Sequence, residues 1–448
     1  MVLNHISPID GRYADKVAEL QEYFSEHALF KYRVKVEVYY FIELIETGVI
    51  GKRNLDQNIK LELLKIIQDY STSDSIRIKE IEKVTRHDVK AVEYFIKEKV
   101  SKAGLEDLIE FIHFGLTSQD INNTASPMLM KDSTDRVLIP LLKECLEELN
   151  SLSSRFRNDT MLARTHGQPA SPTTMGKEIA VFADRLELQI EKLKRIEISG
   201  KFGGATGNFN AHKASFPEID WRNWSDRFLT EKLGISRQRL TTQIAHYDEI
   251  SEWCQCLIRI NTILIDLCRD FWSYISLDYF TQKSVKGEVG SSAMPHKVNP
   301  IDFENAEGNL GLSSSVLGHL AEKLPVSRLQ RDLTDSTVLR NLGVPVAHLV
   351  IALKSIKTGI SKVELNSGKL QQDLESNWVV LAEAIQTILR REHFENPYET
   401  LKDLTRGKKS VTKEDLREFI ESLDVSQTVK EELLTLSPYN YIGYAADF

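Results

Sequence analysis

Hydrophobic residues along most of the chain recur every three or four positions, which is the spacing of amphipathic helices. This spacing predicts helix between residues 14 and 48, and similar patterns follow at 55–69 and 87–99. The longest run covers 247–275, where Asn261 is the only polar residue on the apolar stripe. A helix of about thirty residues would be about 45 Å long. Further long helices are predicted at 121–158, 172–198 and 337–362, with kinks or breaks at Pro127, Pro140 and Pro345.

Strict alternation of hydrophobic and polar residues, the pattern of strands, is scarce, so an all-α fold is predicted. Three helical domains are expected: an N-terminal domain over 1–107, a long central bundle over 108–362 and a small C-terminal domain over 363–448. The apolar stripes of the long helices are wide, which favours assembly of the central bundle into a multi-subunit bundle. A monomeric bundle is the alternative.

The composition is that of an ordinary globular protein, with 42% hydrophobic and 27% charged residues among 448. The formal net charge of −8 argues against general binding to nucleic acid or to a membrane surface. Neither a signal peptide nor an apolar segment of membrane-spanning length is expected. The four cysteines are too scattered for a disulfide framework, so we expect them in the core. Together these features predict a cytoplasmic protein.

One segment concentrates groups that can take part in chemistry, Gly287-Glu-Val-Gly-Ser-Ser-Ala-Met-Pro-His-Lys-Val-Asn-Pro300. It offers the hydroxyls of Ser291 and Ser292, the charge of Lys297 and the amide of Asn299. Its glycines allow backbone angles that are closed to other residues. A simple connection between helices is the alternative, but few connections hold Ser, His, Lys and Asn within ten residues. The segment is therefore interpreted as functional.

Other polar clusters lie in turns between the predicted helices. They are Arg12-Tyr13, Thr85-Arg-His-Asp88, His113-Phe-Gly-Leu-Thr-Ser-Gln-Asp120 and Ala163-Arg-Thr-His-Gly-Gln-Pro169. Each could instead be a helix cap or a turn, and Thr117, Ser118 and Asp120 do have the chemistry of an N-cap. Arg331 and Arg340 flank a hydroxyl-rich stretch that would suit a phosphate, with exposed salt bridges as the alternative.

The glycine-rich run at 200–212 resembles a phosphate-binding loop only superficially. No strand pattern precedes it, and no Gly-Lys-Ser/Thr follows it. It is therefore a weak nucleotide motif.

These motifs, taken together, resemble the adenylosuccinate lyase family of the fumarase/aspartase superfamily. The run Gly290-Ser-Ser-Ala-Met-Pro-His-Lys-Val-Asn-Pro300 is similar to the superfamily's signature loop, and Thr-His-Gly-Gln-Pro and Arg-Asp-Leu-Thr-Asp-Ser occur in family order. The resemblance covers essentially the whole chain. It implies β-elimination of fumarate from adenylosuccinate to give AMP, and from SAICAR to give AICAR. It implies neither metal nor organic cofactor.

The resemblance also implies the roles of individual residues. His166 would be the general acid and Ser291 the general base of the elimination. The family pattern implies a homotetramer whose sites are shared between subunits, and the segment at 284–296 is expected to close over substrate. The residues implied in substrate binding are Arg12, Tyr13, Arg86, His87, Asp88, Thr117, Ser118, Gln243, Ser292, Lys297, Val298, Asn299, Asn305, Arg331, Ser336, Thr337, Val338, Leu339 and Arg340.

Two other interpretations remain open at this point. Another fumarate-releasing lyase, such as argininosuccinate lyase or fumarase, would keep Ser291 and Lys297 but should differ at His296 and lack the run that ends at Arg340. A non-catalytic helical scaffold would be expected to have lost the acid and base, yet His166 and Ser291 are both present.

Overall fold

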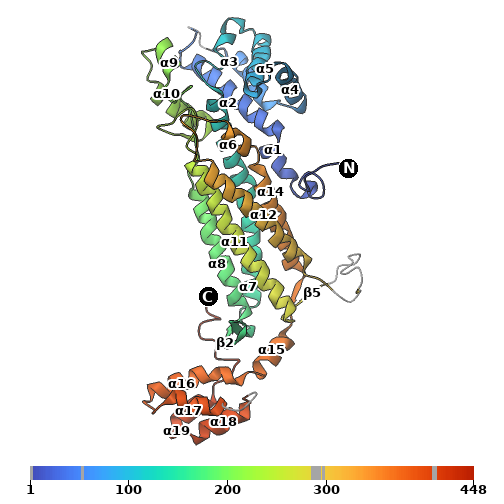
Figure 1. Cartoon of the computed structure of the whole chain (residues 1–448), viewed down its shortest axis with the longest axis vertical. Coiled ribbons are helices and arrows are strands. Elements are labelled where there is room, and N and C mark those ends of the chain that lie inside the picture. Colours follow the sequence, from blue (N-terminus) through green and yellow to red (C-terminus); the bar gives the residue numbers. More distant parts are fainter. Residues whose placement is uncertain (1–3, 52–54, 284–293, 295–297, 406–410) are drawn as a thin grey trace. The chain divides into compact units, whose positions relative to one another are not determined.

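The chain folds mainly into helices (Figure 1). The structure is a computed structural model, and it describes residues 4–51, 55–283, 294, 298–405 and 411–448. The predicted all-α class is confirmed, whereas the three predicted domains and the multi-subunit assembly stay predictions. Contacts divide the chain into two compact units. The first comprises Met1–Leu142, Gln189–Thr262 and Gly308–Ala352, and the second Lys143–Leu188, Ile263–Glu307 and Leu353–Phe448.

The first unit is built around α2 (Glu26–Glu46), which is buried along most of its length. Three neighbouring helices pack around it (Figure 1): α3 (Gln57–Gln68), α4 (Thr72–Thr85) and α5 (Asp88–Lys102). The remaining helices of this unit are α1 (Gln21–Phe24), α6 (Ser118–Ser133), α9 (Asn210–Ser215), α10 (Trp221–Arg227) and α13 (Thr334–Leu339). A short parallel pair, β3 (Ser199–Gly200) and β4 (Ser236–Arg237), completes it.

Five long helices contribute residues to both units. They are α7 (Ile139–Arg155), α8 (Met175–Arg195), α11 (Asp248–Ser276), α12 (Ile301–Lys323) and α14 (Gly343–Lys362). The predicted run at 247–275 is confirmed by α11. Its one polar stripe residue, Asn261, is fully buried and donates hydrogen bonds to Ser313 (2.9 Å) and Ser314 (3.1 Å).

The helix predicted at 14–48 is interrupted. Ser25 has extended backbone angles, and its hydroxyl accepts a hydrogen bond from the Ala28 N–H at 3.0 Å, so it caps α2. The predicted proline breaks also differ in detail. Helix α6 runs through Pro127 without ending, and a π-helical turn at Thr134–Leu138 precedes Pro140. A widened turn suits this place because proline cannot donate the next α-helical hydrogen bond. Pro345 lies in the first turn of α14, where proline is tolerated.

The second unit contains an antiparallel hairpin that the hydrophobic pattern did not predict, β1 (Thr160–Thr165) and β2 (Gln168–Thr174). A second pair joins β5 (Phe280–Gln282) to β6 (Val363–Leu365). The helices that follow are α15 (Ser367–Glu375), α16 (Ala382–Arg391), α17 (Pro397–Thr405), α18 (Lys413–Ser422) and α19 (Gln427–Leu434). Trp378, Ile385, Leu389 and Leu433 belong to a separate apolar core among them.

The four cysteines are free and buried, as predicted: Cys145, Cys254, Cys256 and Cys268. Among the described residues one helical stretch, Thr334–Lys362, is apolar and long enough to meet the length and composition test for a membrane span, which corrects the expectation that no apolar segment reaches that length. More than half of its most apolar window is buried inside the protein, and a core helix passes the same test, so this is weak evidence for a membrane span. Val346, Leu349 and Val350 are fully buried in it.

Candidate active site

A cavity of about 560 Å³ opens in the first unit among α2, the α4–α5 turn, the start of α6 and the segment around α13. This volume is within the range of small-molecule sites. Eight residues that the sequence analysis assigned to substrate binding line it: Arg86, His87, Asp88, Ser118, Arg331, Ser336, Leu339 and Arg340. These residues lie as far apart in the sequence as Arg86 and Arg340, and the fold brings them to one place.

The charge of Asp88 is held between two arginines at the cavity wall. Its Oδ2 accepts hydrogen bonds from Arg33 at 2.9 Å and from Arg340 at 3.2 Å. Burial alone would raise the pKa of Asp88, but Arg33, the Val89 N–H and Arg340 outweigh it and hold the pKa below its ordinary value. Asp88 therefore stays ionised at neutral pH and keeps the guanidinium of Arg340 near the cavity, where an anion could meet it.

His87 precedes α5 and caps it. Its Nδ1 accepts the Lys90 N–H at 3.1 Å, so in the neutral ring the proton lies on Nε2. That nitrogen is 3.5 Å from the Ser118 hydroxyl, and the side chain is about half exposed. Arg86, directly before it, ends α4 with a positive φ of 56°. This arrangement leaves an N–H donor facing the cavity.

The segment around α13 forms another part of the cavity lining. The Arg331 guanidinium donates to the Gln243 Oε1 at 3.0 Å, and Gln243 in turn donates to the Ala205 carbonyl at 3.0 Å. Gln119, which is 1% exposed, donates to Ser336 at 3.3 Å. Gln243 is therefore placed as a support for Arg331 and for the loop at 200–212.

The motif at 113–120 joins several parts of the first unit. His113 bonds Glu37 of α2 at 2.5 Å, and burial by itself would lower the pKa of His113, but the charge and hydrogen bond of Glu37 raise it above its ordinary value. A Cβ at Gly115 would lie 2.8 Å from the ring of His212, so only glycine fits. Ser118 lines the cavity. The motif thus combines structural residues with one that faces the site.

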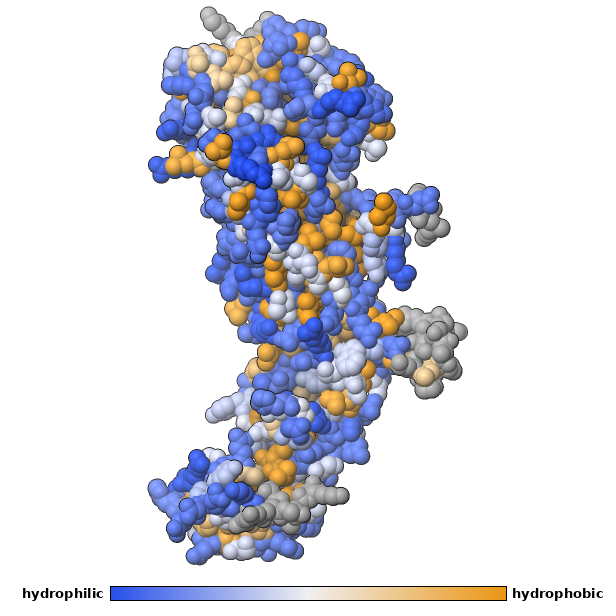
Figure 2. Space-filling model, in the orientation of Figure 1, coloured by the Kyte–Doolittle hydropathy of each residue, from blue (hydrophilic) through white to orange (hydrophobic). Residues whose placement is uncertain are grey.

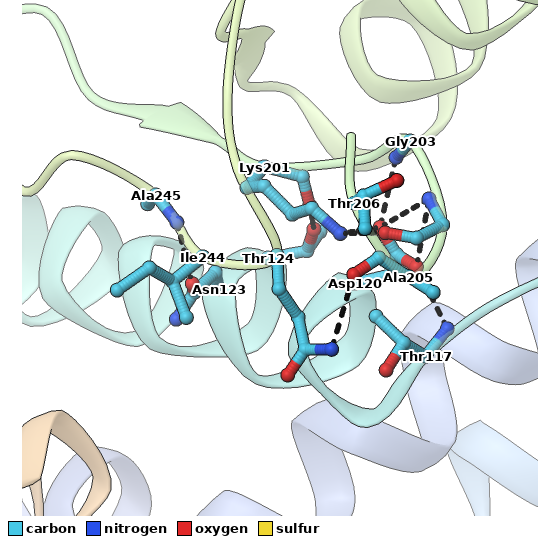
Figure 3. Close-up of polar contacts among 12 residues, drawn as sticks. Thr117, Asp120, Asn123, Thr124, Lys201, Gly203, Ala205, Thr206, Ile244 and Ala245 are labelled. Atoms are coloured by element: carbon cyan, nitrogen blue, oxygen red, sulfur yellow. Dashed lines mark hydrogen bonds and ion pairs between the residues drawn. The ribbon is translucent and has the colours of Figure 1, made fainter. Parts of the chain in front are cut away.

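Asp120 and Lys201 form an ion pair in which neither side chain is exposed (Figure 3). The Lys201 ammonium donates to Asp120 Oδ1 and to the Gly204 carbonyl, both at 2.6 Å. The carboxylate also accepts the backbone N–H groups of Gly203 (2.8 Å), Gly204 (3.1 Å) and Thr117 (2.8 Å). The glycine-rich loop thus directs two of its N–H groups at a side chain of the protein, which agrees with its weakness as a phosphate motif.

Further along α6, Asn123 extends this network. Its Oδ1 accepts the Ala245 N–H at 2.8 Å (Figure 3), and its Nδ2 donates to the Tyr247 hydroxyl at 2.8 Å. Tyr247 donates to Asp335 at 2.7 Å, and Asp335 lies beside Ser336. A chain of buried hydrogen bonds therefore runs from the start of α6 to α13.

In the second unit, His166 lies at the tip of the β1–β2 hairpin and is exposed. Thr165 pairs with Gln168, so His166 and Gly167 form a two-residue turn, with φ of 51° and 75°. Both values are positive, as a type I′ turn requires, and they are costly for histidine. Backbone strain of this kind is found preferentially at functional sites.

The other predicted residues of the second unit have different surroundings. Asn305 on α12 accepts a hydrogen bond from Ser355 of α14 at 2.9 Å. Val298 is 42% exposed, and Asn299 is half-buried. Ser291, Ser292, Lys297 and most of the segment at 284–296 lie outside the described residues.

Six predicted residues of the first unit do not line the cavity. Thr117 precedes α6 and bonds Asp120, while Thr337 and Val338 lie on α13. Arg12 is exposed and stacks on Tyr13, with 6.0 Å from its guanidinium carbon to the ring centre. Gln243, the sixth, acts through Arg331 as described above.

Arg33, Gln119 and Asn122 are among the lining residues that sequence reasoning missed. Arg33 is 3% exposed and also donates to Asn122 at 2.9 Å. A signal was present, because Arg33 and Glu37 are charged residues four positions apart within a helix that is otherwise apolar on its buried face. Among the described residues, no group of three or more His, Cys, Asp or Glu could hold a metal ion.

The chain is similar to known proteins over its whole length. A family model described as lyase matches residues 11–318, and one described as adenylosuccinate lyase C-terminal matches 327–442. An adenylosuccinate lyase of Dictyostelium discoideum is 55% identical, with 100% of this chain and 98% of that protein covered. The adenylosuccinate lyase of Escherichia coli K12 is 50% identical, with 99% and 97% covered.

The chain belongs to the adenylosuccinate lyase family.

This membership confirms the family predicted from the sequence and does not favour argininosuccinate lyase, fumarase or a scaffold. A solved structure of a fumarate lyase from Mesorhizobium sp. BNC1 has a TM-score of 0.75 at 19% identity, with 96% of each chain covered. At that identity the likeness shows the fold alone. The fold of this adenylosuccinate lyase family member is therefore shared with lyases that are distant in sequence.

Replacement of Lys201 by methionine should destabilise the protein strongly, because Asp120 would remain as a buried charge without its cation. Loss of one partner of a buried pair typically costs about 3–5 kcal/mol. Lys131→Met is the matched control. Lys131 lies on α6, the helix of Asp120, and forms an exposed ion pair with Asp135 at 3.0 Å; such exposed pairs contribute about 0.5 kcal/mol to stability. Chemical denaturation of both variants measures the difference; equal losses would contradict this account.

The His113–Glu37 pair should give the protein a pH-dependent stability. Because the folded-state pKa of His113 is raised, its contribution is complete below about pH 6.5, the ordinary value for histidine, and is lost as pH rises through the folded-state pKa. The unmodified protein should therefore lose stability as the pH rises above about 6.5, and His113→Gln should not show this loss. His246→Gln, which alters an exposed contact with Asp248, is the control. Parallel pH profiles for His113→Gln and the parent would refute the assignment.

Proposed function

We propose that this chain catalyses β-elimination of fumarate from adenylosuccinate, releasing AMP, and the same elimination from SAICAR, releasing AICAR. The observation that carries the proposal is its likeness over the full length to relatives named adenylosuccinate lyase, at 55% and 50% identity. The cavity of the first unit supports it, because a substrate with one phosphate and two carboxylates needs cationic donors.

The cavity offers such donors in a suitable arrangement. Arg331, Ser336 and Arg340 line the same cavity, and guanidinium groups with hydroxyls match the oxygens of a phosphate. The Nε2–H of His87 offers a further donor next to Ser118. We assign the phosphate to the Arg331–Arg340 segment, and the rest of the substrate to His87, Ser118 and their neighbours.

The proposed reaction removes a proton from the succinyl carbon beside a carboxylate and breaks the C–N bond. Ser291 takes that proton, and His166 gives one to the leaving nitrogen. Negative charge develops on the succinyl carboxylate side, so Lys297 and Asn299 stabilise it electrostatically. A serine hydroxyl is a weak base, and its role requires a cationic neighbour such as Lys297 in the same segment.

We further propose a homotetramer with shared sites, located in the cytoplasm. The long helices carry exposed apolar side chains (Figure 2), among them Leu188 on α8 (55% exposed), Trp272 on α11 (45%) and Leu312 on α12 (55%). Large apolar side chains on helices favour burial against another subunit. Four free cysteines suit a reducing compartment.

The function is tested by incubating purified protein with adenylosuccinate and following the release of AMP and fumarate spectroscopically. We expect turnover on adenylosuccinate and on SAICAR, and none on argininosuccinate. Inactivity on adenylosuccinate combined with activity on argininosuccinate would overturn the proposal.

His166→Ala and Ser291→Ala should each lower kcat by at least ~10²-fold, the usual scale for a positioned proton donor or acceptor. His319→Ala, at a histidine of α12 that is in neither assigned role, is the control and should retain turnover. If Ser291→Ala assembles correctly and turns over normally, Ser291 is not the base.

The same two inactive variants test the shared site. If residues from several subunits form each site, mixing them under conditions of subunit exchange should restore part of the activity. Full activity of a strictly monomeric species would exclude shared sites.

A further inference from the structure

The hairpin that carries His166 is weakly held by its own backbone. Its pairing is irregular between Leu162 and Arg164, and two-stranded hairpins are marginally stable alone. A turn with positive φ at His166 therefore needs support from outside the hairpin.

That support comes from residues after 363, along both strands. The Thr160 hydroxyl donates to the Tyr439 carbonyl at 3.3 Å, and the Thr174 hydroxyl donates to the Ala445 carbonyl at 2.9 Å. Ser171 donates to Glu383, which also accepts the Tyr441 hydroxyl at 3.0 Å. The contacts therefore begin near the base of the hairpin and continue along β2.

Asp373 on α15 makes the contact nearest the turn. Its Oδ2 accepts Arg164 at 3.1 Å and the Tyr279 hydroxyl at 2.8 Å, and its Oδ1 accepts Lys369 at 2.9 Å. Arg164 is two residues from His166 in sequence. Burial opposes ionisation of Asp373, but Lys369, Tyr279 and Arg164 keep its pKa below the ordinary value. The carboxylate is thus a charged anchor for the end of β1.

Helix α15 also holds β5, the strand that precedes Ser291 in the sequence. Tyr279 is 1% exposed, and its carbonyl accepts the Asn366 N–H at 2.8 Å, where Asn366 caps α15. β5 then pairs with β6 directly before α15. One carboxylate therefore joins the hairpin of the proposed acid to the start of β5.

We propose that Asp373 is a positioning residue for catalysis. We also propose that the region after 363 is the structural support that fixes the His166 turn. The proposal rests on the role of His166 in the proposed function. The role proposed for the C-terminal helices is structural: they contribute side-chain and backbone contacts to the hairpin rather than a reacting group.

Asp373→Asn tests the anchor, because it keeps the shape and one acceptor oxygen but removes the charge that holds Arg164. The matched control is Glu432→Gln, which removes one charge from an exposed ion pair with Arg391 at 2.5 Å. This pair joins α16 to α19, in the same region but away from α15. Misplacement of a reacting group by about 1 Å can cost up to about 10²-fold in rate, so we expect kcat of Asp373→Asn to fall by about 10-fold or more. KM should change little, and Glu432→Gln should keep the parent kcat.

Two further measurements separate positioning from general damage. Amide exchange at residues 163–168 should be faster in Asp373→Asn, while the melting temperature and the assembly state stay near those of Glu432→Gln. Arg164→Met should reduce kcat to a similar extent, and the double variant should lose no more than either single one, because both remove the same contact.

The outcomes distinguish the support role of Asp373 from the proposed function. Suppose that the parent cleaves adenylosuccinate, that His166→Ala is inactive, and that Asp373→Asn has the same kcat as Glu432→Gln. The support role is then refuted, and the proposed function stands. If the parent does not cleave adenylosuccinate, the function fails, and unchanged exchange at 163–168 in Asp373→Asn would then refute the anchor independently.

Discussion

The buried pair of Asp120 and Lys201 is the constraint on which much of the first unit depends. Two charges without solvent exposure are costly, and their mutual attraction compensates only when the remaining lone pairs and protons are also bonded. Here they are, because the carboxylate accepts two N–H groups of the glycine-rich loop and one at the start of α6. The loop and the end of α6 that presents Ser118 to the cavity are consequently fixed by one side chain.

Helix α2 supplies a second set of buried polar contacts. Arg33, Glu37 and Tyr40 follow one another at intervals of four and three residues, so they share a face of the helix. They bond Asp88, His113 and the Phe114 carbonyl respectively. In a low-dielectric core each such bond penalises any other register of the helix, because a displaced group would be left unpaired. The helix therefore sets the spacing between the motifs that reach the site.

The sequence predicted those parts of the fold that depend on local pattern. Helix α11 was recognisable because its stripe is continuous, whereas the interruption at Ser25 was not, since apolar spacing continues on both sides of this cap. The β1–β2 hairpin was missed because its strands are rich in threonine and proline and show no regular alternation. Of the site, the motif residues could be assigned by resemblance. Arg33 could be noticed as a charged residue in an apolar helix, but its place at the cavity follows only from its tertiary contact with Asp88.

The prolines of β2 bear on how the protein avoids strand pairing between molecules. An exposed strand edge with free N–H and C=O groups is a template onto which a strand of another molecule can add. Pro169 is exposed and Pro172 is buried, and neither has an N–H to offer. A neighbouring chain would meet gaps in the row of donors and could not form a continuous ladder. The β1–β2 hairpin, which exposes His166 at its turn, is therefore a poor starting point for a β-sheet between molecules.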